Sequence, residues 1–88
     1  MSGEKARILI VDDEEALRRY LRTILRGQHY AVSEAASGAE ALERAASDNP
    51  NVIILDLGLP DLDGVEVIRR LREWSVTPIV VLSVRDQE

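Results

Sequence analysis

Three short aliphatic runs constrain the fold of this chain more than any other feature of its sequence. Each is four residues long, and they cover 8–11 (ILIV), 52–55 (VIIL) and 79–82 (IVVL). None alternates with polar residues, which is typical of strands buried on both faces, as in a parallel sheet. All three are far shorter than the roughly 20 apolar residues that a membrane-spanning helix requires. We therefore expect a parallel sheet and no contact with a membrane.

The segments between these runs have helical periodicity. Apolar residues from Leu17 to Leu25 recur at helical spacing and stop at Gly27. Ser37 and Glu40 have capping-box spacing, so a second helix is predicted to end near 48–50. A shorter, more polar strand is expected over 30–35, and a third helix over about 65–74 with Trp74 on its inner side. Strands that alternate with helices predict a doubly wound α/β domain with helices on both faces of the sheet.

Length and charge restrict the classes of function. The chain has 88 residues, 11 basic and 16 acidic side chains, a net charge of −5 and no cysteine. This length fits one domain, and the acidic balance argues against binding nucleic acid through its phosphates. Without cysteine there are no disulfides, thiolate metal sites or cysteine nucleophiles, which suits a reducing compartment. We expect a cytoplasmic protein whose own chain binds neither nucleic acid nor membranes.

Polar residues follow each of the three aliphatic runs. Asp12 and Asp13 follow the first, Asp56 the second and Ser83 the third. Because ligands of open α/β sheets bind at the carboxyl edge of the strands, these groups are predicted to converge there. Three carboxylates in one pocket repel one another unless they share protons or hold a hard cation, and oxygen ligands alone favour Mg²⁺. The alternative is structural, since Asp12 and Asp13 could cap the first helix and Ser83 a following one.

These residues stand in motifs that resemble the receiver domain of two-component response regulators, and the likeness extends over the whole chain. The motifs are ILIVDDE at 8–14, SGAEAL at 37–42, DLGLPDLDG at 56–64 and PIVVLS at 78–83. Within the family the chain is most similar to regulators of potassium-uptake operons, which are members of the winged-helix class. The resemblance implies a flavodoxin-like sheet of parallel strands in the order 2-1-3-4.

The resemblance also implies the role of each site residue. Asp56 would be the phosphoacceptor, which takes its phosphoryl group from a sensor histidine kinase and controls a transcriptional output. Asp12, Asp13 and Asp56, with the backbone carbonyl of Gly58, would bind Mg²⁺, and Ser83 would be the switch hydroxyl. A DNA-binding domain of the parent protein would lie outside this chain. The expected role is signalling rather than enzymatic.

The family pattern continues beyond what this chain contains. Receivers have a fifth strand that ends in a lysine, with two further helices, whereas the lysine of this sequence is Lys5, ahead of the first strand. We therefore expect residues 1–88 to form a receiver that lacks these elements and leaves 79–82 as an exposed edge strand. The alternative function is a truncated receiver that binds partners, or associates with itself through that strand or the adjoining face, without competent phosphorylation.

Two further interpretations fit the residues less well. An aspartyl phosphatase would require a second acid two residues after its nucleophile, where Gly58 stands. The spacing of Asp61 and Asp63 is faintly similar to a calcium-binding loop, but Leu59 occupies the position of the first ligand. This segment is therefore predicted to be a turn.

Overall fold

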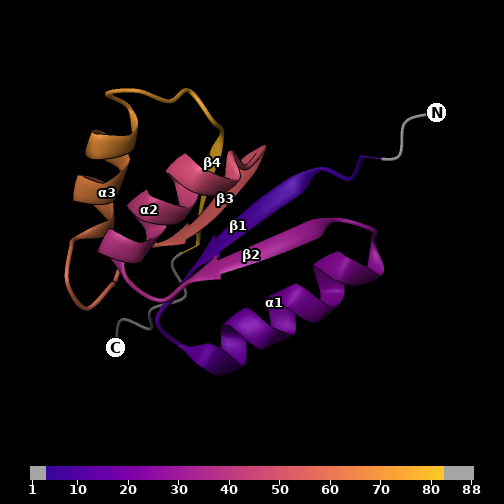
Figure 1. Ribbon diagram of the computed structural model, residues 1–88. Helices are drawn as coiled ribbons and strands as arrows, with labels where there is room; N and C mark the ends of the chain where they lie inside the picture. The colour runs from indigo at the N-terminus through magenta and orange to yellow at the C-terminus, as the bar shows by residue number, and fades with distance from the viewer. Residues whose placement is uncertain (1–3, 83–88) are drawn as a thin grey trace.

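The computed structural model describes residues 4–82, and its centre is a four-stranded parallel sheet. The strands are β1 (Arg7–Val11), β2 (Ala31–Ala35), β3 (Val52–Asp56) and β4 (Ile79–Leu82). Their order in the sheet is β2-β1-β3-β4 (Figure 1). The predicted fold class and strand order are confirmed. Ser83 lies outside the described residues.

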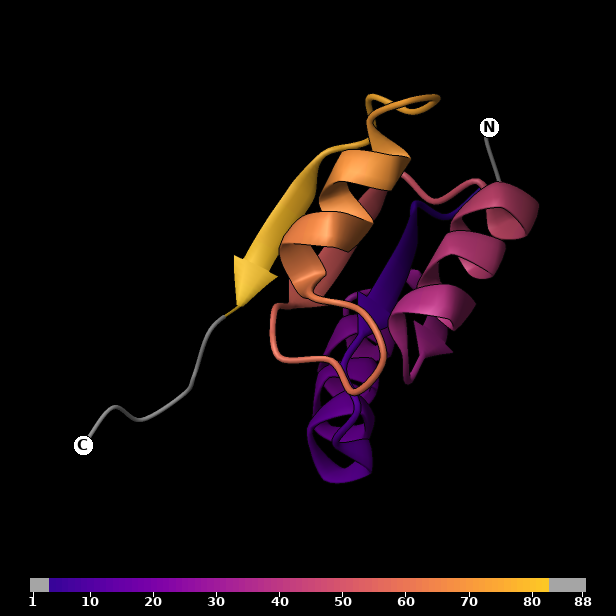
Figure 2. The ribbon, with the colours of Figure 1, turned by 90° about the vertical axis from the view of Figure 1, so that its left-hand side faces the viewer.

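Three helices cover the sheet. They are α1 (Glu15–Gly27), α2 (Gly38–Asp48) and α3 (Gly64–Leu71). The first lies on one face, and α2 and α3 lie together on the other (Figures 1 and 2). No helix within residues 4–82 has the length and apolar character needed to cross a bilayer.

Burial distinguishes the central strands β1 and β3 from the edge strand β4. Leu9 and Ile10 of β1 and Leu55 of β3 are completely inaccessible to solvent. In β4, by contrast, Val80 and Val81 are 49% and 44% exposed. The two kinds of strand have similar aliphatic sequences, so the difference arises from position, because each central strand has a neighbour on both sides.

The third helix is shorter than its sequence pattern predicts. It ends at Leu71, and the amides of Glu73 and Trp74 bond to carbonyls only three residues back, at 3.2 and 3.1 Å. Trp74 therefore lies beyond the regular helix whose periodicity predicts its position, and its side chain is 53% exposed. The prediction that Trp74 lies on the inner side is wrong.

The Ser37 cap of α2 forms as its spacing predicts, whereas Glu40 binds the amide one residue before the N-cap. The Ser37 hydroxyl accepts a hydrogen bond from the Glu40 amide at 3.2 Å, and the Glu40 carboxylate accepts one from the Ala36 amide at 2.8 Å. These bonds fix the start of α2 directly after β2. The start of α2 is therefore held at a fixed position relative to the carboxyl end of β2.

Candidate functional site

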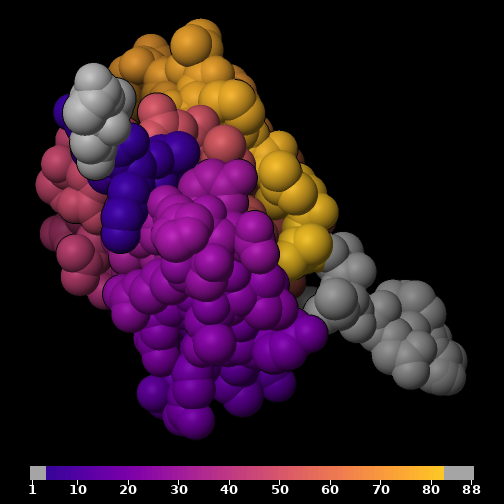
Figure 3. All heavy atoms as spheres, turned by 90° about the vertical axis from the view of Figure 1, so that its right-hand side faces the viewer, coloured from indigo at the N-terminus to yellow at the C-terminus, as the bar shows by residue number. Residues whose placement is uncertain are grey.

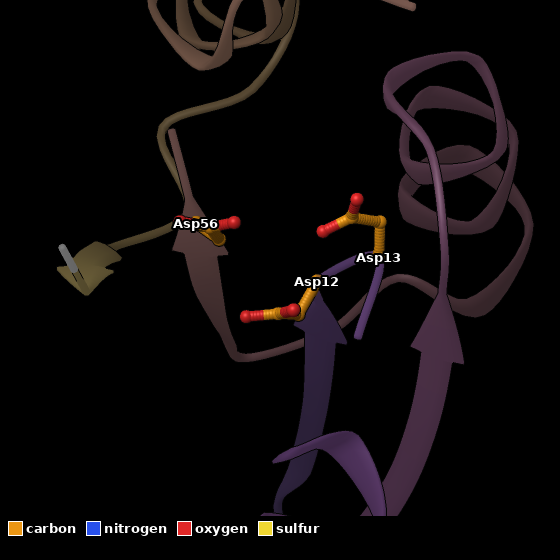
Figure 4. Close-up of side chains that lie close together, drawn as sticks. All are labelled: Asp12, Asp13 and Asp56. Carbon is orange, nitrogen blue, oxygen red and sulfur yellow. The ribbon is translucent and has the colours of Figure 1, made fainter. Parts of the chain in front are cut away.

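Three carboxylates meet at the carboxyl edge of the sheet. Asp12 and Asp13 directly follow β1, and Asp56 is the last residue of β3. The parallel pairing of Val11 with Leu55 brings the ends of these two strands level. One carboxylate oxygen from each of the three residues lies within 4.8 Å of the others (Figure 4). The structure thus brings together three of the residues that the sequence analysis selected.

The electrostatics of this cluster favour a bound cation. Asp12 is buried, and burial raises the pKa of its carboxyl group above the ordinary value. The Glu14 amide, which donates to Oδ1 of Asp12 at 2.7 Å, opposes this rise, whereas the charges of Asp56 and Asp13 add to it. Asp13 is exposed and Asp56 is partly buried, so the cluster remains open to solvent. An all-oxygen, anionic donor set of this kind fits Mg²⁺.

The backbone at Asp12 is fixed from two sides. Its amide donates to the carbonyl of Ala35 in β2 at 3.1 Å, and its own carbonyl accepts from Nη1 of Arg18 in α1 at 2.6 Å. Both Arg18 and Arg22 also bind the carboxylate of Glu34 in β2. The end of β1 is therefore held by a network that joins α1 to β2. The hydrogen bond from the Glu14 amide to the Asp12 carboxylate also shows that Asp12 has a structural role at the start of α1.

This network leads to a stability prediction for Glu34. Burial would raise the pKa of its carboxyl group, but hydrogen bonds from Arg22 and Arg18 outweigh burial and lower it. Replacing Glu34 with Gln is expected to reduce the free energy of unfolding at pH 7 by about 1–2 kcal/mol. The contribution is complete above the unfolded-state value of 4.5 and disappears as the pH falls through the lower folded pKa.

Urea denaturation of both proteins from pH 7 to pH 3 measures this difference. The control is Glu66→Gln, since Glu66 pairs with Arg69 and Arg70 on the open surface of α3, where solvent screens the charges. We expect a smaller loss for the control. An equal deficit of Glu34→Gln at both ends of the pH range would contradict the assigned role of the charge.

Two other residues that the sequence analysis considered, Gly58 and Lys5, are not members of the carboxylate cluster. Gly58 is partly buried in the loop between β3 and α3, two residues beyond Asp56. The Gly64 amide closes this loop by donating to the Leu57 carbonyl at 3.0 Å. Lys5 precedes β1, at the opposite end of that strand from the carboxylates.

One residue of this loop has a contact that the sequence analysis missed. Asp61, predicted only as part of a turn, binds the first amides of α2, at Gly38 and Ala39. Its partners lie 23 and 22 residues earlier in the chain, so no local pattern identifies them. Ordinary capping signals connect residues two or three apart.

Comparison with known proteins identifies the family. Residues 8–88 match the family model described as the response regulator receiver domain. The chain belongs to this family. A match of this extent includes all three clustered carboxylates, the loop after β3 and the edge strand.

Relatives with longer chains share this region. The KDP operon transcriptional regulatory protein KdpE of Escherichia coli is 54% identical over 81 residues, which are 92% of this chain and 36% of that protein. The transcriptional regulatory protein ResD of Bacillus subtilis is 43% identical over 84 residues, which are 96% of this chain and 35% of that protein. The chain thus spans about a third of the length of the curated relatives it matches.

Solved structures show the same fold. The chemotaxis response regulator CheY4 of Vibrio cholerae aligns with a TM-score of 0.88 and 33% identity, over 96% of this chain and 72% of that one. The BeF3-activated N-terminal receiver domain of Klebsiella pneumoniae RstA aligns with a TM-score of 0.86 and 29% identity, over 93% and 70%. The resemblance inferred from the sequence motifs is confirmed at the level of family and fold.

Proposed function

We propose that this chain is a phosphoacceptor receiver domain, spanning residues 1–88, that takes a phosphoryl group from a sensor histidine kinase onto Asp56. The observation that carries the proposal is the position of Asp56 at the end of β3, with its carboxylate beside those of Asp12 and Asp13. A carboxylate here is fixed by the sheet yet partly open to solvent. The transcription-regulator relatives further support a role in gene control, and we propose that it operates in the cytoplasm.

The proposed reaction is a direct displacement at phosphorus. A carboxylate oxygen of Asp56 forms a bond to phosphorus as the bond to the phosphohistidine nitrogen breaks, and the electron pair of that bond stays on the imidazole. The product is an acyl phosphate on Asp56. Such a mixed anhydride hydrolyses readily, which makes the signal reversible.

The remaining site residues would prepare the pocket for this reaction. Asp12, Asp13 and Asp56, with the carbonyl of Gly58, are proposed to hold Mg²⁺, which when bound offsets negative charge on the phosphoryl oxygens. Arg18 keeps the end of β1 in place through its bond to the Asp12 carbonyl. We propose that the Ser83 hydroxyl donates a hydrogen bond to the phosphorylated side chain.

The metal assignment predicts a loss of Mg²⁺ affinity in Asp13→Ala. Removal of one anionic oxygen ligand is expected to weaken binding at least about tenfold. Titration with Mg²⁺, followed by amide chemical shifts, gives the affinity. Glu43→Ala is the matched control, because Glu43 is exposed on α2 and its loss changes the net charge equally. Equal affinities in wild type and Asp13→Ala would rule out Asp13 as a ligand.

A second candidate function rests on the apolar edge of the sheet. Val80 and Val81 leave β4 half-exposed, and Figure 3 shows this strand at the surface. On the neighbouring face, α1 carries Tyr20 and Ile24, which are 64% and 43% exposed. An apolar strand edge is a template for pairing with another chain. The alternative is that this chain associates with a second copy of itself, or binds partners, without phosphorylation.

Self-association through β4 predicts a concentration-dependent mass for the 88-residue chain. Sedimentation over a dilution series is expected to show dimers that dissociate as the concentration falls. Val80→Lys should shift the equilibrium towards monomer, because a charge on the edge opposes pairing. Val65→Lys is the control, since Val65 is 60% exposed on α3. A monomer at micromolar concentration with rapidly exchanging amides along β4 would exclude this mode of association.

A further inference from the structure

A hydrogen-bonded clamp joins the loop after β3 to the start of α2. The carboxylate of Asp61 accepts from the amides of Gly38 at 2.7 Å and Ala39 at 3.0 Å. Oδ1 of Asp61 also accepts from the amide of Leu62 at 2.8 Å, which fixes the orientation of the carboxylate within its own loop. Figure 2 shows this loop reaching from the end of β3 towards the first turn of α2.

The clamp complements the Ser37 cap of the same helix. Ser37 accepts from the Glu40 amide, which leaves the amides of Gly38 and Ala39 for Asp61. The first turn of a helix has amides without intrahelical partners, and a carboxylate there is favoured by the helix dipole. Hydrogen bonds from these backbone amides, with that of Ala39 first, lower the pKa of Asp61.

Side-chain packing adds to the clamp. A methyl group built on Gly38 would lie 2.7 Å from Cβ of Leu62 and 3.0 Å from a methyl group of Val67. The glycine therefore allows Leu62 to approach the helix closely. The loop is in direct contact with α2 through both the Asp61 carboxylate and the Leu62 side chain.

The clamp acts on the segment that contains Gly58. This segment begins at Asp56 in the sheet and is closed by the bond from the Gly64 amide to the Leu57 carbonyl. Asp61 lies between these two points and attaches the segment directly to the first turn of α2. Without the clamp, the same segment would keep its ends but lose its polar attachment to the rest of the molecule.

We propose that Asp61 is a positioning residue, which holds the loop of Gly58 in place over the carboxyl edge of the sheet by clamping it to α2. The clamp itself depends only on the contacts described above. Its consequence for metal binding rests on the proposed function, because it requires that the Gly58 carbonyl be a ligand of Mg²⁺. Loss of the clamp then weakens Mg²⁺ binding although Asp61 touches none of the three carboxylates.

Hydrogen exchange in the metal-free 88-residue chain tests the clamp. In Asp61→Ala, the amide of Gly64 is expected to exchange at least about tenfold faster than in wild type, after correction for any change in global stability measured by urea denaturation. Ser37→Ala is the matched control, because it removes a cap from the same end of α2 without detaching the loop. Asp61→Asn keeps one acceptor oxygen and should show an intermediate rate.

Mg²⁺ titration of the same variants tests the consequence. Asp61→Ala is expected to bind Mg²⁺ several-fold more weakly than wild type, whereas Ser37→Ala binds it with wild-type affinity. If the Gly64 amide exchanges no faster in Asp61→Ala than in Ser37→Ala, the clamp is refuted. If the clamp is found and wild type binds Mg²⁺ but the two variants have equal affinities, its role in metal binding is refuted. Failure of wild type to bind Mg²⁺ would reject the proposed metal site, and the exchange experiment would still decide the clamp.

Discussion

Replacement of Asp56 with Asn is expected to abolish modification of the chain by beryllofluoride or a small phosphodonor in the presence of Mg²⁺. The amide of asparagine is a poor nucleophile and does not form the acyl phosphate. In wild type we expect a low yield, because the proposed domain of residues 1–88 lacks the cationic contact that the family resemblance implies, and loss of one such contact typically costs about 10²–10³ in rate. Mass spectrometry of the intact protein gives the modified fraction.

Asp48→Asn is the control for this experiment. Asp48 lies at the end of α2, and its change removes an aspartate without altering the cluster at the sheet edge. We expect the control to be modified to the same extent as wild type. A product that persists in Asp56→Asn would show that another group is the acceptor. A yield in wild type equal to that of a receiver that has the lysine would contradict the expected contribution of that residue.

Gly64→Ala is expected to reduce the free energy of unfolding more than the same substitution at Gly27 or Gly38. A Cβ at this position would lie 2.6 Å from Cα of Leu57 and 3.2 Å from the carbonyl oxygen of Asp56. Both are backbone atoms, so the clash is relieved only if the loop moves. Overpacking of this kind costs about 1–3 kcal/mol, and we expect the upper end of that range. Urea denaturation of the variant measures the loss.

Gly27→Ala is the matched control, because it adds the same methyl group at the end of α1 where no atom lies within 4 Å. It should leave stability unchanged or raise it by up to about 1 kcal/mol through helix propensity. The displaced loop should also reduce Mg²⁺ affinity in Gly64→Ala. Equal stabilities of the two alanine variants would show that the loop adapts to the extra methyl group without cost.

The sequence contains the information that places the carboxylates together. Asp12 and Asp56 each follow an aliphatic run, and the parallel arrangement of such strands puts their carboxyl ends at one edge. This inference uses only local patterns and one general rule of topology. The Ser37 cap could be predicted for the same reason, since its two partners lie three residues apart.

Two other features could not be predicted from periodicity and local motifs. Trp74 is exposed and lies beyond the end of α3 at Leu71, and helical periodicity alone does not show where a helix ends. The attachment of Asp61 to α2 joins residues from two different elements. A pattern within one window of sequence does not detect the Asp61 contact, because its partners lie 22 and 23 residues away.

The burial of Asp12 links the site to the stability of the whole domain. A carboxyl group whose pKa is higher in the folded chain than in the unfolded chain favours unfolding as the pH rises above its unfolded value. At neutral pH the acidic edge of the sheet therefore weakens the fold that supports it. A cation that binds only the folded chain reverses this effect by mass action. If the proposed Mg²⁺ site is correct, a higher cation concentration is therefore expected to increase the resistance of this domain to unfolding.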